Sequence, residues 1–228
     1  MARPRRKNLN GADQYRIIPS RLPPISIYEE FVAPDELEIT YALESMTNDR
    51  LQAQAGHLYL LDKKDWVTGP GASVVMAAFT HIGQKSRFSD GSYGVYYAGL
   101  DAETAIAETV FHQERRMRET AEKAIEIDMR CYSGTVEAPL EDIRGTGFSA
   151  FQHQSIDSWP VCQRFAAQRR AENAAGLLYK SARHVGGECI AGFRTRTVSV
   201  PQQSRHLRYC WNGSRIDRVL YVEDIRVL

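Results

Sequence analysis

The chain has 228 residues, of which 43% are hydrophobic, enough for one domain with a full core. Its 29 Lys and Arg residues nearly balance its 28 Asp and Glu residues, and a net charge of +1 argues against a dedicated nucleic-acid binder. The four cysteines are far apart and form no CxxC pair, so the sequence indicates neither a zinc ribbon nor a disulfide framework. No apolar run is long enough to span a bilayer, and the N-terminus lacks the apolar core of a signal peptide. We therefore expect a cytoplasmic protein without membrane or direct nucleic-acid contacts.

The first quarter of the chain combines a basic segment with few clear elements. Residues 1–14 are basic and poor in apolar side chains, which predicts a flexible arm ahead of a catalytic domain over 15–228. Asp35 follows a proline and is expected to open a helix, and Leu58–Leu61 is typical of a strand. The glycine-rich Gly69–Ser73 lacks the lysine and hydroxyl of a phosphate-binding P-loop. We interpret it as a turn into a buried element.

The second half alternates strands with a helix. Residues 125–129 place apolar and charged side chains in strict alternation, the pattern of a strand with one wet face. Asn-Gly between two apolar runs favours a hairpin with a type I′ turn. The elements expected after 129 are a helix over 165–175, strands over 177–179 and 189–193, and a hairpin with arms at 209–211 and 216–222. This order predicts a mixed α/β fold in a single compact domain, with an antiparallel contribution from the hairpin.

The stretch from Ser86 to Glu108 is the most informative part of the sequence. Val95–Ala98 has the composition of a short buried strand, and glycines flank it as turns do. Asp101 is then a plausible N-cap of a helix that carries Glu108 two turns in, on a face beside its apolar stripe. This strand-turn-helix unit thus carries one arginine, an aromatic pair and one carboxylate along its length. Such a set suits a phosphate-bearing ligand with an aromatic ring.

These residues carry a resemblance to a known family. SRFSDGSYGVYYA, followed by TAIAE and far downstream by GLLYKSARHVGGECIAGFR, resembles the RES domain, the toxin half of RES–Xre toxin–antitoxin pairs. Arg87 lies ten residues before Tyr97, Tyr97 lies eleven before Glu108, and Ser181 would be the family's serine. The chain resembles the longer branch of this family, which has an SRF motif at this position, whereas many other members have GRW. The resemblance implies a compact α/β fold akin to ADP-ribosyltransferases that binds NAD and breaks its nicotinamide–ribose bond.

Two of the motif residues have a clear chemical use. The guanidinium fork of Arg87 matches phosphate oxygens and would neutralise the NAD pyrophosphate. Glu108 could be a mere surface carboxylate, but a fixed carboxylate also stabilises the cationic ribose that forms when nicotinamide departs. Tyr96 and Tyr97 face opposite sides of a strand, so only one can line a pocket, and the spacing favours Tyr97. Phe88, beside Arg87, is placed in the same ligand-binding set.

Ser181 allows several interpretations. It could be an ordinary strand-end hydroxyl, or a nucleophile, since His184 lies three residues on, although no GxSxG elbow is present. We favour a hydrogen bond that orients a ribose or the Glu108 carboxylate. Arg183 would assist at the phosphates. The histidines form no metal-ligand pattern such as HExxH, so no metal is expected.

Three classes of function follow from these observations. The leading hypothesis is a toxin that transfers ADP-ribose from NAD to a host protein; with water or inorganic phosphate as acceptor, the same cleavage would deplete NAD. A second class is a non-catalytic nucleotide-binding module, and the weakest is a nucleic-acid-interacting protein that uses the basic arm. The resemblance also implies a cognate antitoxin with an Xre-like helix-turn-helix domain, which would cover the cleft between Arg87 and Ser181, and a higher-order assembly of the two.

Overall fold

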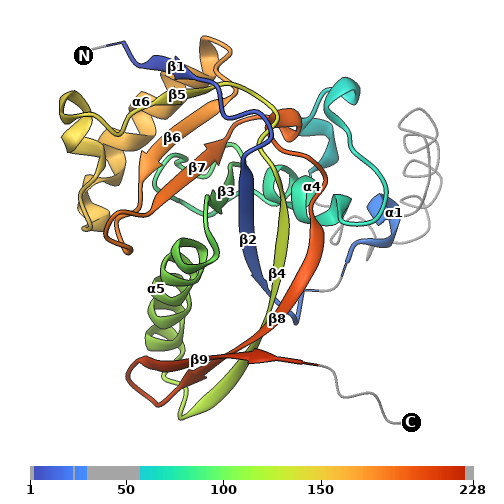
Figure 1. Ribbon diagram of the computed structural model, residues 1–228, viewed down its shortest axis with the longest axis vertical. Helices are drawn as coiled ribbons and strands as arrows, with labels where there is room; N and C mark the ends of the chain where they lie inside the picture. Colours follow the sequence, from blue (N-terminus) through green and yellow to red (C-terminus); the bar gives the residue numbers. More distant parts are fainter. Residues whose placement is uncertain (1–2, 23, 30–56, 224–228) are drawn as a thin grey trace.

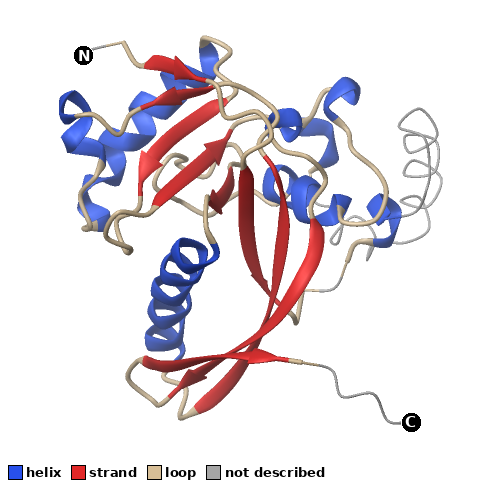
Figure 2. Ribbon diagram, viewed as in Figure 1, coloured by secondary structure: helices blue, strands red, loops and turns tan. Residues whose placement is uncertain are grey.

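The computed structural model describes residues 3–22, 24–29 and 57–223. They form a nine-stranded sheet in the order β1-β5-β6-β7-β3-β2-β4-β8-β9, with helices packed around it (Figures 1 and 2). The strands are β1 (Arg5–Lys7), β2 (Asp13–Pro19), β3 (Tyr96–Gly99), β4 (Ile125–Thr135), β5 (Leu140–Asp142), β6 (Gly176–Lys180), β7 (Glu188–Gly192), β8 (Gln202–Trp211) and β9 (Ile216–Val222). The α-helices are α1 (Ser26–Glu29), α4 (Ala72–Thr80), α5 (Ala102–Thr120) and α6 (Trp159–Ala171). The mixed α/β class expected from the sequence is confirmed.

The sheet is nearly divided in two between β3 and β2. These strands share a single register pair, Tyr15 opposite Gly99, whereas β2 pairs with β4 along its whole length from Asp13 to Pro19. One half therefore comprises β1, β5, β6, β7 and β3, and the other comprises β2, β4, β8 and β9. Among these described strands, only the pair β5 and β6 is parallel. Helix α5 contacts both β2 and β3 at the junction (Figure 1). Side chains on α5 can thus meet residues from both halves.

Local sequence signals explain where α5 begins and which face it buries. Asp101 has an extended backbone and its Oδ1 accepts a hydrogen bond from the Thr104 N–H at 2.6 Å, as expected for an N-cap. Ile106, Val110 and Met117 pack on the core cluster over β4 and β8. This arrangement leaves the neighbouring face of the helix for polar side chains.

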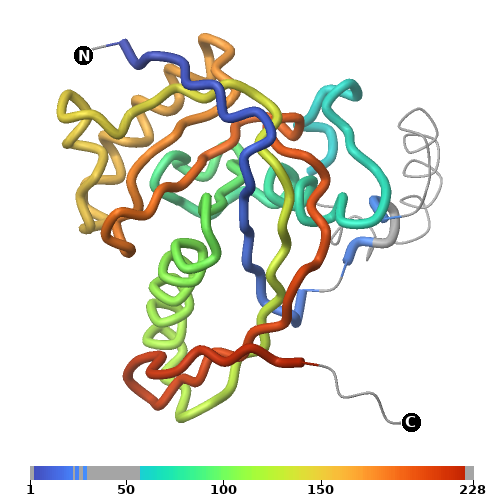
Figure 3. Tube along the Cα trace, viewed as in Figure 1, coloured from blue at the N-terminus to red at the C-terminus, as the bar shows by residue number. Residues whose placement is uncertain are grey.

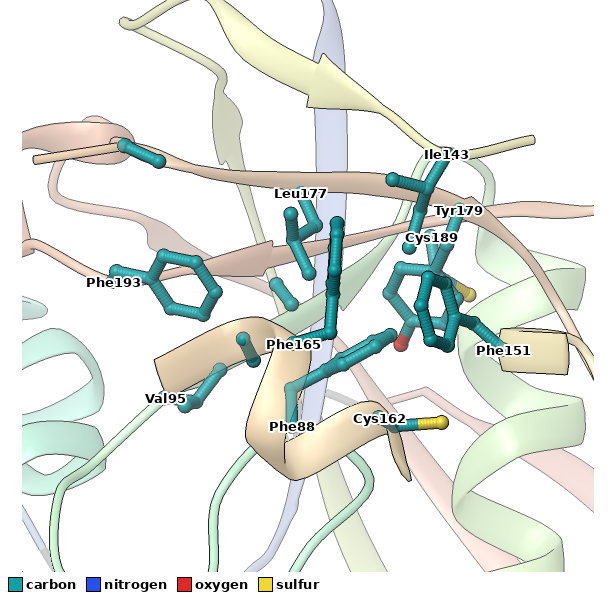
Figure 4. Packing of buried hydrophobic residues seen from close by; sticks show 13 residues of the cluster. Phe88, Val95, Ile143, Phe151, Cys162, Phe165, Leu177, Tyr179, Cys189 and Phe193 are labelled. Carbon is teal, nitrogen blue, oxygen red and sulfur yellow. The ribbon is translucent and has the colours of Figure 1, made fainter. Parts of the chain in front are cut away.

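The half-sheet of β1, β5, β6, β7 and β3 has its core between its strands and α6. Phe88, Leu177 and Tyr179 belong to a buried cluster (Figure 4). The cluster also contains the rings of Phe151, before α6, and Phe165, within α6. The rings of Phe151 and Phe165 lie 4.5 Å apart between centroids, in a stacked arrangement. Helix α6 starts at Trp159, earlier than the sequence predicted, because a short 3-10 turn over Ile156–Ser158 leads directly into it.

The N-terminal segment differs from the expected arm. Arg5–Lys7 pairs antiparallel with Leu140–Asp142 as the edge strand of the sheet, and β2 already begins at Asp13 (Figure 3). The side chains of Arg5–Lys7 are exposed, so no hydrophobic pattern marks the strand. Residues ahead of the boundary predicted at residue 15 therefore pair with strands of the sheet. The helix expected from Asp35 lies outside the described residues.

Two other local predictions need correction. Leu58–Leu60 forms a 3-10 turn rather than a strand, with only Leu58 buried. The terminal hairpin is confirmed, but four residues, Asn212–Arg215, connect its strands. Of the pair expected to turn, only Gly213 has a positive φ, whereas a type I′ turn needs two. The Asn212 Oδ1 instead accepts hydrogen bonds from the N–H groups of Ser214 and Arg215, each at 3.0 Å.

Candidate active site

A cavity of about 750 Å³ lies at the junction of the two half-sheets, beside α5. Its size is within the ~300–1,000 Å³ of typical ligand pockets. The wall includes residues of β2, β3, α5, β6 and β7, together with the segment before β3 and the first residue of α6. Of the residues predicted from sequence, Arg87, Tyr97, Glu108 and Arg183 line it, whereas Phe88 and Ser181 do not.

Glu108 presents one constrained and one free oxygen. Its Oε1 accepts hydrogen bonds from the Ser181 hydroxyl at 2.6 Å and from the Ala182 N–H at 3.1 Å. No hydrogen bond reaches Oε2 from the residues that the structure describes. Two donors fix the carboxylate without consuming its second oxygen, which remains available to a ligand in the cavity.

Ser181 holds the Glu108 carboxylate in place through a hydrogen bond. Its Oγ accepts the N–H groups of Arg183, at 3.0 Å, and His184, at 2.9 Å, so its own proton is directed to Glu108. With both acceptor positions occupied and the proton donated to a carboxylate, the hydroxyl is poorly arranged to act as a nucleophile. The structure thus supports the orienting interpretation of Ser181 and corrects the expectation that it contacts the ligand directly.

The two tyrosines separate as strand geometry requires. Tyr97 lines the cavity, and its hydroxyl accepts the Phe88 N–H at 3.0 Å and lies 2.8 Å from the Ser86 Oγ. Tyr96 is fully buried on the opposite face, where its hydroxyl donates to the Gln14 Oε1 at 3.1 Å. Burial raises the pKa of Tyr97 above its ordinary value, so its phenol is neutral near pH 7.

Phe88 is a core residue rather than a ligand contact. Its side chain is completely buried and stacked on the ring of Tyr97, with 6.4 Å between centroids. It also lies edge-on to Tyr179 at 5.0 Å (Figure 4). The sequence places it next to Arg87, and both residues lie in a turn closed by a bridge between Ser86 and Ser89, in which Arg87 lines the cavity and Phe88 is buried. Phe88 therefore supports Tyr97 from within the core.

Arg87 shapes the cavity wall as well as facing it. Its Nη1 donates to the carbonyl oxygens of Phe151, at 2.9 Å, and His153, at 3.0 Å, so it holds the segment that leads to α6. Within the described ranges, its Nε and Nη2 have no hydrogen-bond partner. These nitrogens remain available for an anionic ligand.

Arg183 lines the same cavity as Glu108. Its Nη2 donates to the Gln154 carbonyl at 2.6 Å, and its guanidinium lies 3.4 Å from the centroid of the Phe111 ring. Burial lowers the pKa of Arg183, and the negative charge of Glu108 opposes this shift. Two segments distant in sequence therefore bring this cation and Glu108 together.

Arg16 on β2 is a site residue that the sequence analysis missed. It lines the cavity, donates from Nη1 to the Tyr97 carbonyl at 2.9 Å and lies 4.6 Å from the centroid of the Tyr96 ring. Burial lowers its pKa, its Nε is buried without a partner, and no carboxylate in the described part of the chain pairs with it. The available signal was a lone arginine inside the otherwise apolar Tyr15–Ile18.

The cavity concentrates positive charge that the whole chain does not have. Among the described residues, its wall contains seven cationic side chains and two carboxylates, although the net charge of the protein is only +1. The cations are Arg16, Arg21, Lys85, Arg87, Arg115, Arg116 and Arg183, and the carboxylates are Glu108 and Glu119. The described residues contain no group of three potential metal ligands. The site is thus suited to an anionic organic ligand.

Comparison with known proteins agrees with the motifs. The family model of the RES domain matches residues 57–212, about two thirds of the chain, including Arg87, Tyr97, Glu108 and Ser181. This chain belongs to the RES-domain family. The matched range begins after Arg16, so this cavity-lining arginine of the RES protein was found from the structure alone.

Similar proteins include one relative matched over most of its length and one solved structure. The uncharacterized protein y4oC of Sinorhizobium fredii (strain NBRC 101917 / NGR234) is 30% identical over 220 residues, which cover 92% of this RES protein and 87% of the relative. The crystal structure of the M. tuberculosis MbcT–MbcA toxin–antitoxin complex matches at 13% identity with a TM-score of 0.38, over 56% of this chain and 72% of that one. Among the described helices, none combines the length and apolar character needed to cross a membrane.

Proposed function

We propose that this RES domain is the toxin of a toxin–antitoxin pair, which cleaves the nicotinamide–ribose bond of NAD and transfers the ADP-ribose to a host protein. The observation that carries the proposal is the Glu108 carboxylate, fixed by Ser181 and Ala182 with Oε2 left free in a cation-rich cavity. Membership of the RES family supports an NAD-related activity.

Cleavage places a demand on the protein that Glu108 can meet. When the bond between ribose C1′ and the nicotinamide nitrogen breaks, the electron pair leaves with nicotinamide, which departs as a neutral molecule. Positive charge then develops on the C1′–O4′ unit of the ribose. A fixed carboxylate stabilises this charge more than it stabilises the substrate, because the substrate carries its charge on the nicotinamide ring. Since Glu108 is held in place before the reaction, little reorganisation is needed.

The remaining cavity residues would bind the rest of NAD. Arg87 and Arg16 offer guanidinium N–H groups without protein partners, which suit the pyrophosphate oxygens. Tyr97 would pack on the nicotinamide riboside, with its ring supported by Phe88. Arg183, which lines the same cavity, would assist at the phosphates.

The acceptor defines the overall reaction. A nucleophile attacks C1′, forms the new bond and loses its proton to solvent or to a base. Resemblance to the longer SRF branch favours a side chain of a host protein, whereas water would give free ADP-ribose and inorganic phosphate would give its 1″-phosphate. The cleavage step is the same in all three reactions.

A non-catalytic nucleotide-binding module is the second candidate. Such a module would need Arg87 and Tyr97 but could function without Glu108. The two donors directed at the Glu108 Oε1 favour the enzyme, because a surface carboxylate of a binding module requires no such support.

The partner forms part of the proposal. An antitoxin with an Xre-like helix-turn-helix domain would cover the cavity between Arg87 and the segment that follows Ser181, and thereby exclude NAD. A complex in which the antitoxin binds elsewhere and leaves NAD turnover unchanged would contradict this part.

The test is to incubate the purified protein with NAD and a bacterial lysate, and to identify the products by mass spectrometry. We expect free nicotinamide together with an ADP-ribosylated protein, and neither product with Glu108→Gln. Free ADP-ribose or its 1″-phosphate would change the acceptor but preserve the cleavage. Intact NAD after prolonged incubation would support the binding module.

A further inference from the structure

The cavity wall contains two pairs of a guanidinium and an aromatic ring, and of these four residues the proposed chemistry uses only Arg183, at the phosphates. The Arg115 guanidinium lies 5.7 Å from the centroid of the Trp159 ring, and the Arg183 guanidinium lies 3.4 Å from that of Phe111. All four residues line the cavity. Arg115 is seven residues beyond Glu108 on α5, so it lies about 10 Å further along the helix at ~1.5 Å per residue.

These pairs contain donors that the protein itself does not satisfy. Trp159 is 8% exposed, and its indole Nε1–H has no hydrogen-bond partner in the described part of the chain. The Arg183 Nε is likewise buried and unpaired. Buried donors without partners cost about 1–3 kcal/mol each, so acceptor atoms of a ligand would stabilise this region. The only ion pair of Arg115 in the described residues is with Glu119, and the two side chains are 42% and 64% exposed.

A planar heteroaromatic ring with acceptor nitrogens matches this surface. Arginine and aromatic planes both stack on nucleobases, and base–aromatic stacking contributes ~1–3 kcal/mol per base. The phosphates of such a ligand would lie beside Arg87, whose guanidinium holds the carbonyls of Phe151 and His153, a few residues before Trp159.

We infer that Phe111, Arg115 and Trp159 form a binding site for the adenine ring of the dinucleotide, with Arg183 at the border between this site and the phosphates. This inference rests on the proposed use of NAD, and it fixes the direction of the substrate: nicotinamide lies at Glu108 and Tyr97, and adenine lies at Trp159. The adenine half should then bind without the nicotinamide half.

Isothermal titration with fragments of the substrate tests the site. We expect AMP and ADP-ribose to bind the wild-type protein, and Trp159→Leu to weaken both at least tenfold while leaving the affinity for nicotinamide mononucleotide unchanged. Trp159→Phe should keep most of the affinity because it keeps a stacking ring. Trp66→Phe, which changes a buried tryptophan outside the cavity, is the matched control and should bind all fragments normally.

A second variant keeps the test decisive if Trp159→Leu fails to fold, as judged by circular dichroism. Arg115→Gln changes a partly exposed side chain and should weaken AMP binding several-fold. Unchanged AMP affinity in folded Trp159→Leu, or in Arg115→Gln where the former does not fold, would overturn the adenine site, as would a wild type that binds NAD but not AMP. Failure of the wild type to bind NAD and every fragment would overturn the proposed function as well.

Discussion

Replacement of Glu108 by glutamine is the sharpest test of the proposed chemistry. Gln keeps the size of the side chain, and its carbonyl oxygen can take the place of Oε1 and accept from Ser181 and Ala182. Its amide NH₂ then occupies the position of Oε2. The variant therefore changes a negative oxygen facing the ribose into a neutral donor, with the surrounding hydrogen bonds retained.

The expected effect follows from the charge that is removed. A unit charge about 4 Å from a developing cation contributes ~4 kcal/mol at an effective dielectric constant of ~20. Loss of a single preorganised electrostatic contact in other enzymes costs ~2.7–4 kcal/mol, a factor of about 10²–10³ in turnover. We expect Glu108→Gln to lower the rate of nicotinamide release by this factor. NAD affinity should change far less, because the ground state carries its positive charge on nicotinamide.

The assay combines single-turnover nicotinamide release with NAD dissociation constants. Glu119→Gln is the matched control, since Glu119 is on the same helix and lines the same cavity but is exposed and paired with Arg115. That control should release nicotinamide at the wild-type rate. If Glu108→Gln also does so at saturating NAD, Glu108 has no part in the mechanism and the binding-module hypothesis gains the weight.

Three other predictions concern support, binding and acid stability. Ser181→Ala removes one hydrogen bond to the Glu108 carboxylate, of a kind that contributes ~1.5–3 kcal/mol, so nicotinamide release should slow about 10- to 100-fold with little change in NAD affinity; an unchanged rate would show that Ala182 alone positions Glu108. Arg16→Gln should raise the NAD dissociation constant about tenfold or more, with release at saturation near the wild-type rate, because a phosphate contact exists in ground and transition states alike; normal NAD affinity in titration would remove Arg16 from the site. Hydrogen bonds from Arg144 lower the pKa of Asp142 in the folded protein, so this carboxylate stabilises the fold above its unfolded pKa of ~3.9, and the stabilisation is lost as pH falls through the lower folded value. Urea unfolding at pH 7 and at pH 3 should therefore show Asp142→Asn less stable than wild type at pH 7 and closer to it at pH 3, and a difference independent of pH would contradict this linkage.

Much of the site's local framework was predictable from the sequence alone. A short β-branched and aromatic run between glycines gave the strand at Tyr96–Gly99, and Asp101 marked the start of the helix that carries Glu108. Strand alternation also implied that the side chains of Tyr96 and Tyr97 point to opposite faces of the sheet. In the structure Tyr97 lines the cavity and Tyr96 is buried. These features are local, because a cap, a turn and the period of an element depend on residues only a few positions apart.

The assembly of the site was decided by the tertiary structure. Arg16 meets the Tyr97 carbonyl across 81 positions of sequence, and Ser181 meets Glu108 across 73. Phe88 turned into the core instead of the cavity because the rings of Tyr97 and Tyr179 pack around it. Which strands become neighbours depends on the total burial and pairing that each arrangement achieves, and no short stretch of sequence contains that sum. The sequence thus determined the identity of the chemical groups and their local elements, whereas the order of the strands determined which of these groups face the same cavity.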